Sequence, residues 1–195
     1  MFLKLPPETE ANARLYKADL CERGFVMNLS RLWGWRPEIA EGFSALRSAL
    51  TNESTLSKRE LGVLVCATAT TLGDSYCALA WGKSLSTAAD PRTAVTVLRG
   101  TEDESLTVCD RALTRWARKV VKDPNATMPA DVEDLRKAGF TEKEILEATA
   151  FIAFRVAFST INDAPGVQPD LQVAAAPLEV RDAVTFGRPV ADRAS

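Results

Sequence analysis

Apolar residues along this chain recur at helical spacing, and proline and glycine divide them into segments of helical length. The predicted helices cover residues 8–22, 37–50, 57–71, 75–85, 105–122, 129–137 and 142–161, with a short one between Asp90 and Gly100. No stretch alternates apolar and polar residues as a half-buried strand would. The pattern therefore predicts an all-α fold.

Local signals mark the starts of three of these helices. Ser57 with Glu60, and Thr141 with Glu144, have the spacing of a capping box, in which two side chains satisfy free backbone N–H groups. Asp74 is expected to cap the helix over residues 75–85. Cys77 would then lie at the third position of that helix.

Residue pattern also indicates which segments form the core. The helix over 57–71 is apolar almost all round, so we place it at the centre. The segment 25–35 is predicted to be a loop, but it is too apolar to be a solvated linker. The helix over 8–22 offers one face for burial, made of Ala11, Leu15, Ala18 and Leu20.

Length and charge limit the organisation and the partners. The chain has 195 residues, which predicts one domain over 1–170 and a C-terminal arm or tail over 171–195. The formal charge is 24 − 26 = −2, and no apolar run is long enough to span a membrane, so we expect neither nucleic acid nor membrane as a partner. The first residues contain no apolar segment of signal-peptide length, so the expected location is the cytoplasm.

The chain has no histidine, which excludes histidine triads, histidine general bases and histidine-containing metal sites. Its four cysteines are Cys21, Cys66, Cys77 and Cys109, and none forms a C-x-x-C pair. We therefore expect reduced thiols, no bound metal and no cofactor.

Four stretches nevertheless resemble one known family. They are LSKRELGVLVCATATTLGDSYC (56–77), GFVMNLSRLWGWRPEI (24–39), DVEDLRKAGFTEKEI (131–145) and PGVQPD (165–170). Together they are similar to the alkylhydroperoxidase AhpD-like, or carboxymuconolactone decarboxylase, family, in its "peroxidase-related" branch. The resemblance covers most of the chain and implies an AhpD-like helical bundle that assembles as a homo-oligomer. Trp33, Trp35, Phe2 and Phe43, in or beside loops, offer apolar surface for such an assembly.

The same resemblance implies an active-site pattern that this chain has largely lost. Active members have a Glu, a C-x-x-C motif twelve residues later and a His four residues after its second Cys. The corresponding positions here are Gly62, Asp74, Cys77 and Trp81. Only the second cysteine survives, as Cys77, so the predicted site is degenerate.

Cys77 is the candidate nucleophile, and Cys66 is a speculative resolving thiol because it lies one turn after Gly62 on the same helix face. Gly62, Asp74, Tyr76 and Trp81 are expected to line the site. The helix N-terminus favours a thiolate at Cys77 and the Asp74 carboxylate opposes it. Alternatively, both cysteines are small core residues, Asp74 is only a cap, and Trp81 fills the pocket or forms an aromatic wall.

Three functions stay open at this point. The first is an AhpD-like antioxidant-family protein whose degenerate thiol-peroxidase centre leaves it weakly active, or a structural or small-ligand-binding protein. The second is an oxidoreductase, a thiol-dependent hydroperoxide reductase that uses Cys77 with Cys66 or an external thiol. The third is a decarboxylase or lyase of the same superfamily. Expected partners are a second copy of the chain and a small hydroperoxide or apolar ligand.

Overall fold

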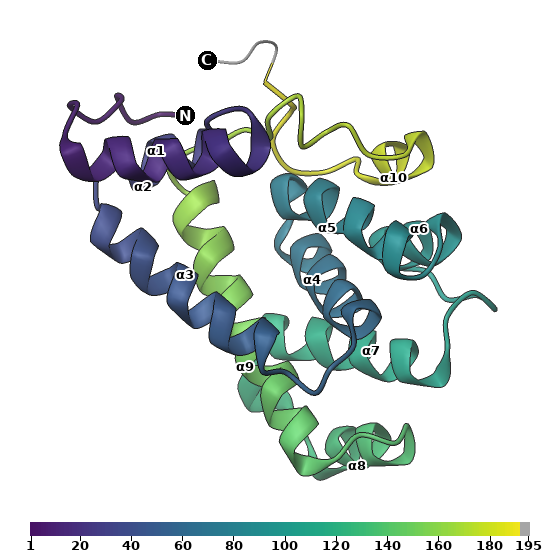
Figure 1. Cartoon of the computed structure of the whole chain (residues 1–195). Helices are drawn as coiled ribbons and strands as arrows, with labels where there is room; N and C mark the ends of the chain where they lie inside the picture. Colours follow the sequence, from purple (N-terminus) through teal and green to yellow (C-terminus); the bar gives the residue numbers. More distant parts are fainter. Residues whose placement is uncertain (192–195) are drawn as a thin grey trace.

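The computed structural model describes residues 1–191, and all regular structure in that part of the chain is helical (Figure 1). The elements in order are α1 (Glu10–Arg23), α2 (Asn28–Trp33), α3 (Pro37–Asn52), α4 (Lys58–Leu72), α5 (Ser75–Ala88), α6 (Pro91–Arg99), α7 (Val108–Lys122), a 3₁₀ turn η1 (Pro124–Ala126), α8 (Pro129–Lys137), α9 (Glu142–Asp163) and α10 (Leu178–Ala183). The predicted all-α class is confirmed.

Helix α4 lies at the centre of the molecule, as its all-round apolar sequence predicts (Figure 1). Residues 61–69 are all buried, and the helix packs against α5, α6, α7 and α9. The α4–α5 contact is close, because a Cβ at Gly62 would lie only 3.1 Å from a methyl carbon of Leu85. Gly62 thus lets the two helices that carry the candidate residues pack side by side.

All three predicted helix caps are present. Ser57 and Glu60 form a capping box at the start of α4, and Thr141 and Glu144 form one at the start of α9. The Asp74 carboxylate accepts the backbone N–H of Cys77 at 2.8 Å. These caps fix the starts of the two helices, α5 and α9, whose side chains meet in the candidate site.

The structure corrects two predictions near the N-terminus. The predicted loop at 25–35 contains α2, and the indole N–H of Trp33 donates to the side chain of Asn162 on α9 at 2.7 Å. Helix α1 buries the polar residues Asn12 and Asp19, whereas Leu20, expected on its buried face, is 52% exposed. The reason is that these two polar side chains bind backbone groups of the preceding and following segments, Pro7 and Met27.

After α9 the chain turns back over the start of α5. Helix α10 packs against α5 and α6. Further along, the hydroxyl of Ser75 donates to the backbone carbonyl of Arg188 at 2.7 Å. The last part of the predicted arm, residues 192–195, lies outside the described residues. Within residues 1–191 no helix is long and apolar enough to cross a membrane.

Candidate functional site

Cys77, the candidate nucleophile, lies at the third position of α5 and is 4% exposed. Its backbone N–H is bound by the Asp74 carboxylate, which is itself 1% exposed. The first turn of a helix normally offers free N–H groups that stabilise a thiolate. Here the N–H of Cys77 is already bound to the Asp74 carboxylate, so this N–H group is not free to stabilise a thiolate at the sulfur.

Two polar side chains of α9 complete the surroundings of Cys77. The guanidinium of Arg155 approaches the Cys77 sulfur at 2.7 Å through Nη2. One turn later, the Ser159 hydroxyl donates to Asp74 at 2.6 Å and lies 3.9 Å from the same sulfur. Positions i and i+4 of α9 therefore face positions i and i+3 at the start of α5, and the four side chains form one buried cluster.

The cluster holds one negative and one positive side chain in the protein interior. Arg155 is 4% exposed, and its Nε has no hydrogen-bond partner among the described residues. Its guanidinium lies over aromatic rings, 4.8 Å from the centre of Phe158 and 5.7 Å from that of Trp81. Such faces attract cations, and Asp74 supplies the compensating charge across Ser159 and Cys77.

Burial raises the pKa of the Cys77 thiol well above its usual value. The positive charge of Arg155 lowers that pKa, whereas the carboxylate of Asp74 raises it. The two side-chain charges thus act in opposite directions, and loss of hydration sets the outcome. Because the thiolate is the nucleophile, a thiol in this setting is a weak one near neutral pH.

The second candidate cysteine, Cys66, is completely buried within the main core. Burial raises the pKa of its thiol to about 12, and the charge of Arg155 opposes that rise. Cys77 belongs to the same apolar cluster, and all four cysteines are free thiols. Cys66 therefore lies within the electrostatic reach of Arg155, in surroundings that disfavour its ionised form.

The structure draws some of the predicted lining residues together and separates others. Asp74 and Trp81 both surround the Arg155–Cys77 contact. Gly62 instead faces Leu85, where it serves helix packing. Tyr76 instead belongs to a second apolar cluster, together with Leu32, Trp33 and Val167. Its hydroxyl donates a hydrogen bond to Asp170.

Sequence reasoning missed Arg155 and Ser159. A signal was available, since Arg155 is the one charged residue between Glu147 and Asp163 in a helix otherwise rich in alanine and phenylalanine. A lone charge in such a segment needs a buried partner, but the sequence does not identify it. Among residues 1–191 the structure contains no group of three or more histidine, cysteine or acidic side chains able to hold a metal ion.

Comparison with known proteins identifies the fold. No model of a protein family and no curated protein matches the sequence. Among solved structures, one described as an alkylhydroperoxidase AhpD core, an uncharacterized peroxidase-related protein from Ralstonia eutropha JMP134, matches with a TM-score of 0.80 at 24% identity, covering 92% of this chain and 96% of that one. An uncharacterized peroxidase-related protein from Silicibacter sp. TM1040 matches with a TM-score of 0.78 at 21% identity, over 90% of this chain and 94% of that one.

A third similar structure is the debrominase Bmp8, as a cysteine-to-alanine variant in complex with 2,3,4-tribromopyrrole. Its TM-score is 0.75 at 15% identity, with 94% of this chain and 98% of that one covered. These matches extend over nearly the whole of each chain. The AhpD-like fold expected from the sequence resemblance is thereby confirmed.

Proposed function

We propose that this chain is an AhpD-like peroxidase-related protein whose thiol-peroxidase centre has been replaced by a buried, charge-compensated cluster. It would be at most a weak hydroperoxide reductase, and its role would be structural or the binding of a small ligand. The fold alone does not decide the reaction, since a debrominase shares it. The proposal is therefore argued from the site.

The observation that carries the proposal is the enclosure of the Cys77 sulfur by Arg155, Ser159 and Asp74, with the sulfur side chain itself buried. Reduction of a hydroperoxide needs a thiolate that reaches the O–O bond, a group that takes up and returns the proton, and a second thiol to resolve the sulfenic acid. Arginine cannot act as that proton carrier, because it stays protonated. Loss of general acid–base assistance typically lowers a rate by about 10²–10⁴-fold.

A peroxide-consumption assay with a dithiol reductant tests the proposal. Wild type is compared with Cys77→Ser, Cys66→Ser and the reductant alone. We expect wild type to consume peroxide only slightly faster than the reductant, and any excess to disappear in Cys77→Ser. Robust turnover that is lost in both variants would refute the proposal and establish Cys66 as the resolving thiol.

Thiol accessibility gives an independent check. A thiol-specific reagent at about pH 6 should label Cys77 hardly at all in the folded protein, because burial raises its pKa. The exposed Cys21 serves as the internal reference, and peptide mass spectrometry separates the two sites. Labelling of Cys77 ahead of Cys21 at that pH would identify an activated nucleophile.

A second candidate function, thiol-dependent peroxide reduction, is favoured by one specific contact. Arg155 approaches the Cys77 sulfur at 2.7 Å, which is the arrangement that stabilises a developing thiolate. If this function applies, Arg155→Met should lower turnover about as much as Cys77→Ser, whereas Arg155→Lys should retain part of it. If the cluster is structural, neither arginine variant changes the peroxide rate and both lower stability.

A further inference from the structure

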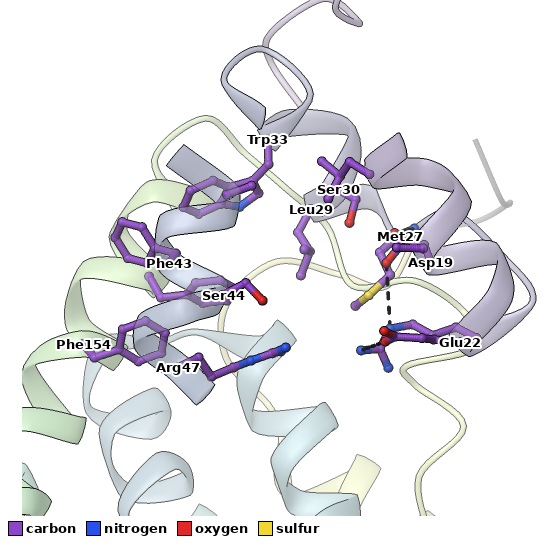
Figure 2. A pocket seen from close by; sticks show the side chains of 15 residues that line it. Asp19, Glu22, Met27, Leu29, Ser30, Trp33, Phe43, Ser44, Arg47 and Phe154 are labelled. Atoms are coloured by element: carbon purple, nitrogen blue, oxygen red, sulfur yellow. Dashed lines mark hydrogen bonds and ion pairs between the residues drawn. The ribbon is translucent and has the colours of Figure 1, made fainter. Parts of the chain in front are cut away.

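A separate groove opens between α1, α2, α3 and α9 (Figure 2). Two of its lining residues, Phe154 and Phe158, are also rings against which the Arg155 guanidinium lies. It has a volume of about 200 Å³. Its inner wall is made of four aromatic rings, those of Trp33, Phe43, Phe154 and Phe158. Neither Cys66 nor Cys77 lines it.

The aromatic wall is held in place by ring–ring contacts. Trp33 lies 5.1 Å from Phe43 and 5.8 Å from Phe158, and Phe43 lies 5.7 Å from Phe154, between ring centres. The hydrogen bond from Trp33 to Asn162 fixes the indole further. The rings therefore present a formed surface that needs little rearrangement to receive another flat apolar group.

The groove stays open because α3 places small residues against it. Ala40 and Ser44 lie one turn apart among the lining residues, and none of the sixteen residues of α3 is fully buried. Protein interiors are close-packed, so an unfilled space beside four aromatic rings is a departure from ordinary packing. Its size suits a molecule of one or two rings, because sites for drug-sized ligands are larger, roughly 300–1,000 Å³.

Arg47 is the charged side chain of the groove that is free to contact a ligand. Figure 2 shows its side chain extending from α3 into the groove, and among residues 1–191 it has no ion-pair partner. On the facing wall Arg23 is within ion-pair distance of both Asp19 (3.9 Å) and Glu22 (3.6 Å). Asp19 also accepts the backbone N–H of Met27. The charged lining residues therefore sum to zero, and Arg47 is the one among them without an ion-pair partner within residues 1–191.

We propose that this groove binds a small aromatic anion, with its ring against the aromatic wall and its acidic group at Arg47. A guanidinium matches a carboxylate or sulfonate through paired N–H donors. The site gives the binding role of the proposed function a location and a ligand class, and in that respect rests on it. It does not depend on the reactivity of Cys77, so the peroxide assay and a binding assay can fail separately.

Two fluorescent dyes of similar size test the proposal. 5-Dimethylaminonaphthalene-1-sulfonate, which has two fused rings, carries a negative charge, and the corresponding 1-sulfonamide does not. Wild type should bind one equivalent of each, with quenching of tryptophan fluorescence that is reduced in Trp33→Phe. Arg47→Gln should weaken binding of the anionic dye about threefold to fivefold and leave the neutral dye within about twofold, as expected for one exposed charge contact.

The matched control is Arg181→Gln, which removes an exposed arginine from α10, away from the groove. It should change neither affinity. Ser44→Phe, which fills the groove, should weaken both dyes, and cooperative thermal unfolding of each variant verifies that it is folded. Equal affinity of wild type and Arg47→Gln for the anionic dye would overturn the assignment of the anion. Undiminished binding of both dyes to Ser44→Phe would overturn the assignment of the groove.

Discussion

Cys77 and Asp74 lie three residues apart at the start of α5. They differ in which side chain accepts a hydrogen bond from the free backbone N–H groups of the helix N-terminus. The Asp74 carboxylate takes the backbone N–H of Cys77, and Ser159 donates to the same carboxylate. A buried carboxylate held by two donors and faced by a buried guanidinium is a stable arrangement. The same arrangement keeps the neighbouring thiol protonated, because the charge of Asp74 and its hydrogen bond to the thiol both raise the pKa of Cys77.

Asp74→Asn should make Cys77 more reactive. The amide oxygen keeps the cap on the Cys77 N–H, but the negative charge that adds to the rise of the thiol pKa is removed, so only burial still opposes Arg155. The rate of Cys77 alkylation, followed by peptide mass spectrometry across a pH series, should shift to lower pH. Ser159→Ala is the control that removes a hydrogen bond without changing charge. An unchanged pH profile in Asp74→Asn would show that access, rather than charge, limits the thiol.

Asp163, at the end of α9, should make folding stability depend on pH. Burial raises its pKa to about 7, with the Asp74 carboxylate adding to the rise and Arg188 opposing it. The folded protein therefore binds more protons than the unfolded chain between about pH 4 and 7. Stability attributable to this group is present at the acidic end of that window and is lost as the pH rises through 7.

Urea unfolding at several pH values from about 5 to 8 checks this behaviour. Wild type should lose more stability over that range than Asp163→Asn, which cannot ionise. Glu179→Gln, an exposed acidic residue of α10, should follow the wild-type curve. Parallel curves for wild type and Asp163→Asn would contradict the raised pKa.

For single residues, the sequence predicted the contacts between residues close in the chain. It did not predict the contacts between residues far apart in the chain. The Asp74 cap and the position of Cys77 follow from residues three apart. The partners of Cys77 on α9 are 78 and 82 positions away, and only the packing of both α5 and α9 against α4 brings them close. Spacing along the chain contains no information on which helix faces which.

Helix bounds were predicted well where capping and helix-breaking residues mark the ends. They were predicted poorly where a short helix is stabilised by packing against the rest of the protein. The apolar pattern did not predict α2, because six residues are too few for a clear helical period. In contrast, α8 was predicted over 129–137, its observed bounds, because Pro129 begins it and Gly139 follows its end. The arm had no periodic signal, yet Val180 of α10 is completely buried.

The contact between α10 and α5 should be sensitive to one added methyl group. A Cβ at Gly82 would lie 2.7 Å from Val180 and 3.0 Å from Leu98, both of which are buried. Gly82→Ala should therefore destabilise the protein by ~1–3 kcal/mol. Gly42→Ala on α3 meets nothing within 4 Å and should stabilise by ~0.5–1 kcal/mol through helix propensity.

Chemical denaturation of the two alanine variants beside wild type measures both effects. They share the same chemical change and the same kind of helical backbone, so the difference isolates packing against α10. A loss of stability in both variants would mean that the glycines matter for some reason other than this contact. Equal stability of Gly82→Ala and wild type would mean that α10 moves aside at little cost.

On the scale of the whole molecule, similarity of fold extends further than similarity of sequence. Two structures of peroxidase-related proteins superpose over at least 90% of this chain at identities of only 24% and 21%. A core tolerates extensive apolar substitution when pattern and volume are kept. The proposed site has no such tolerance, since a tryptophan such as Trp81 at the position of a proton carrier cannot transfer a proton. The resemblance could therefore predict the fold but not the reaction.

Self-association is the prediction that belongs to the complete molecule. Helix α3 buries none of its residues fully, and Ile39 and Leu46, seven positions apart on one face, are 37% and 49% exposed. That face differs from the one that lines the groove, so a second copy could cover it and leave the groove open. Light scattering at micromolar concentration should show a homo-oligomer, and Leu46→Lys should shift it toward monomer. Leu146→Lys, an equally drastic change at an exposed position of α9, should leave the mass unchanged. A monomeric wild type would refute self-association. A Leu46→Lys variant that stays assembled would show that the interface is not on the face of Ile39 and Leu46.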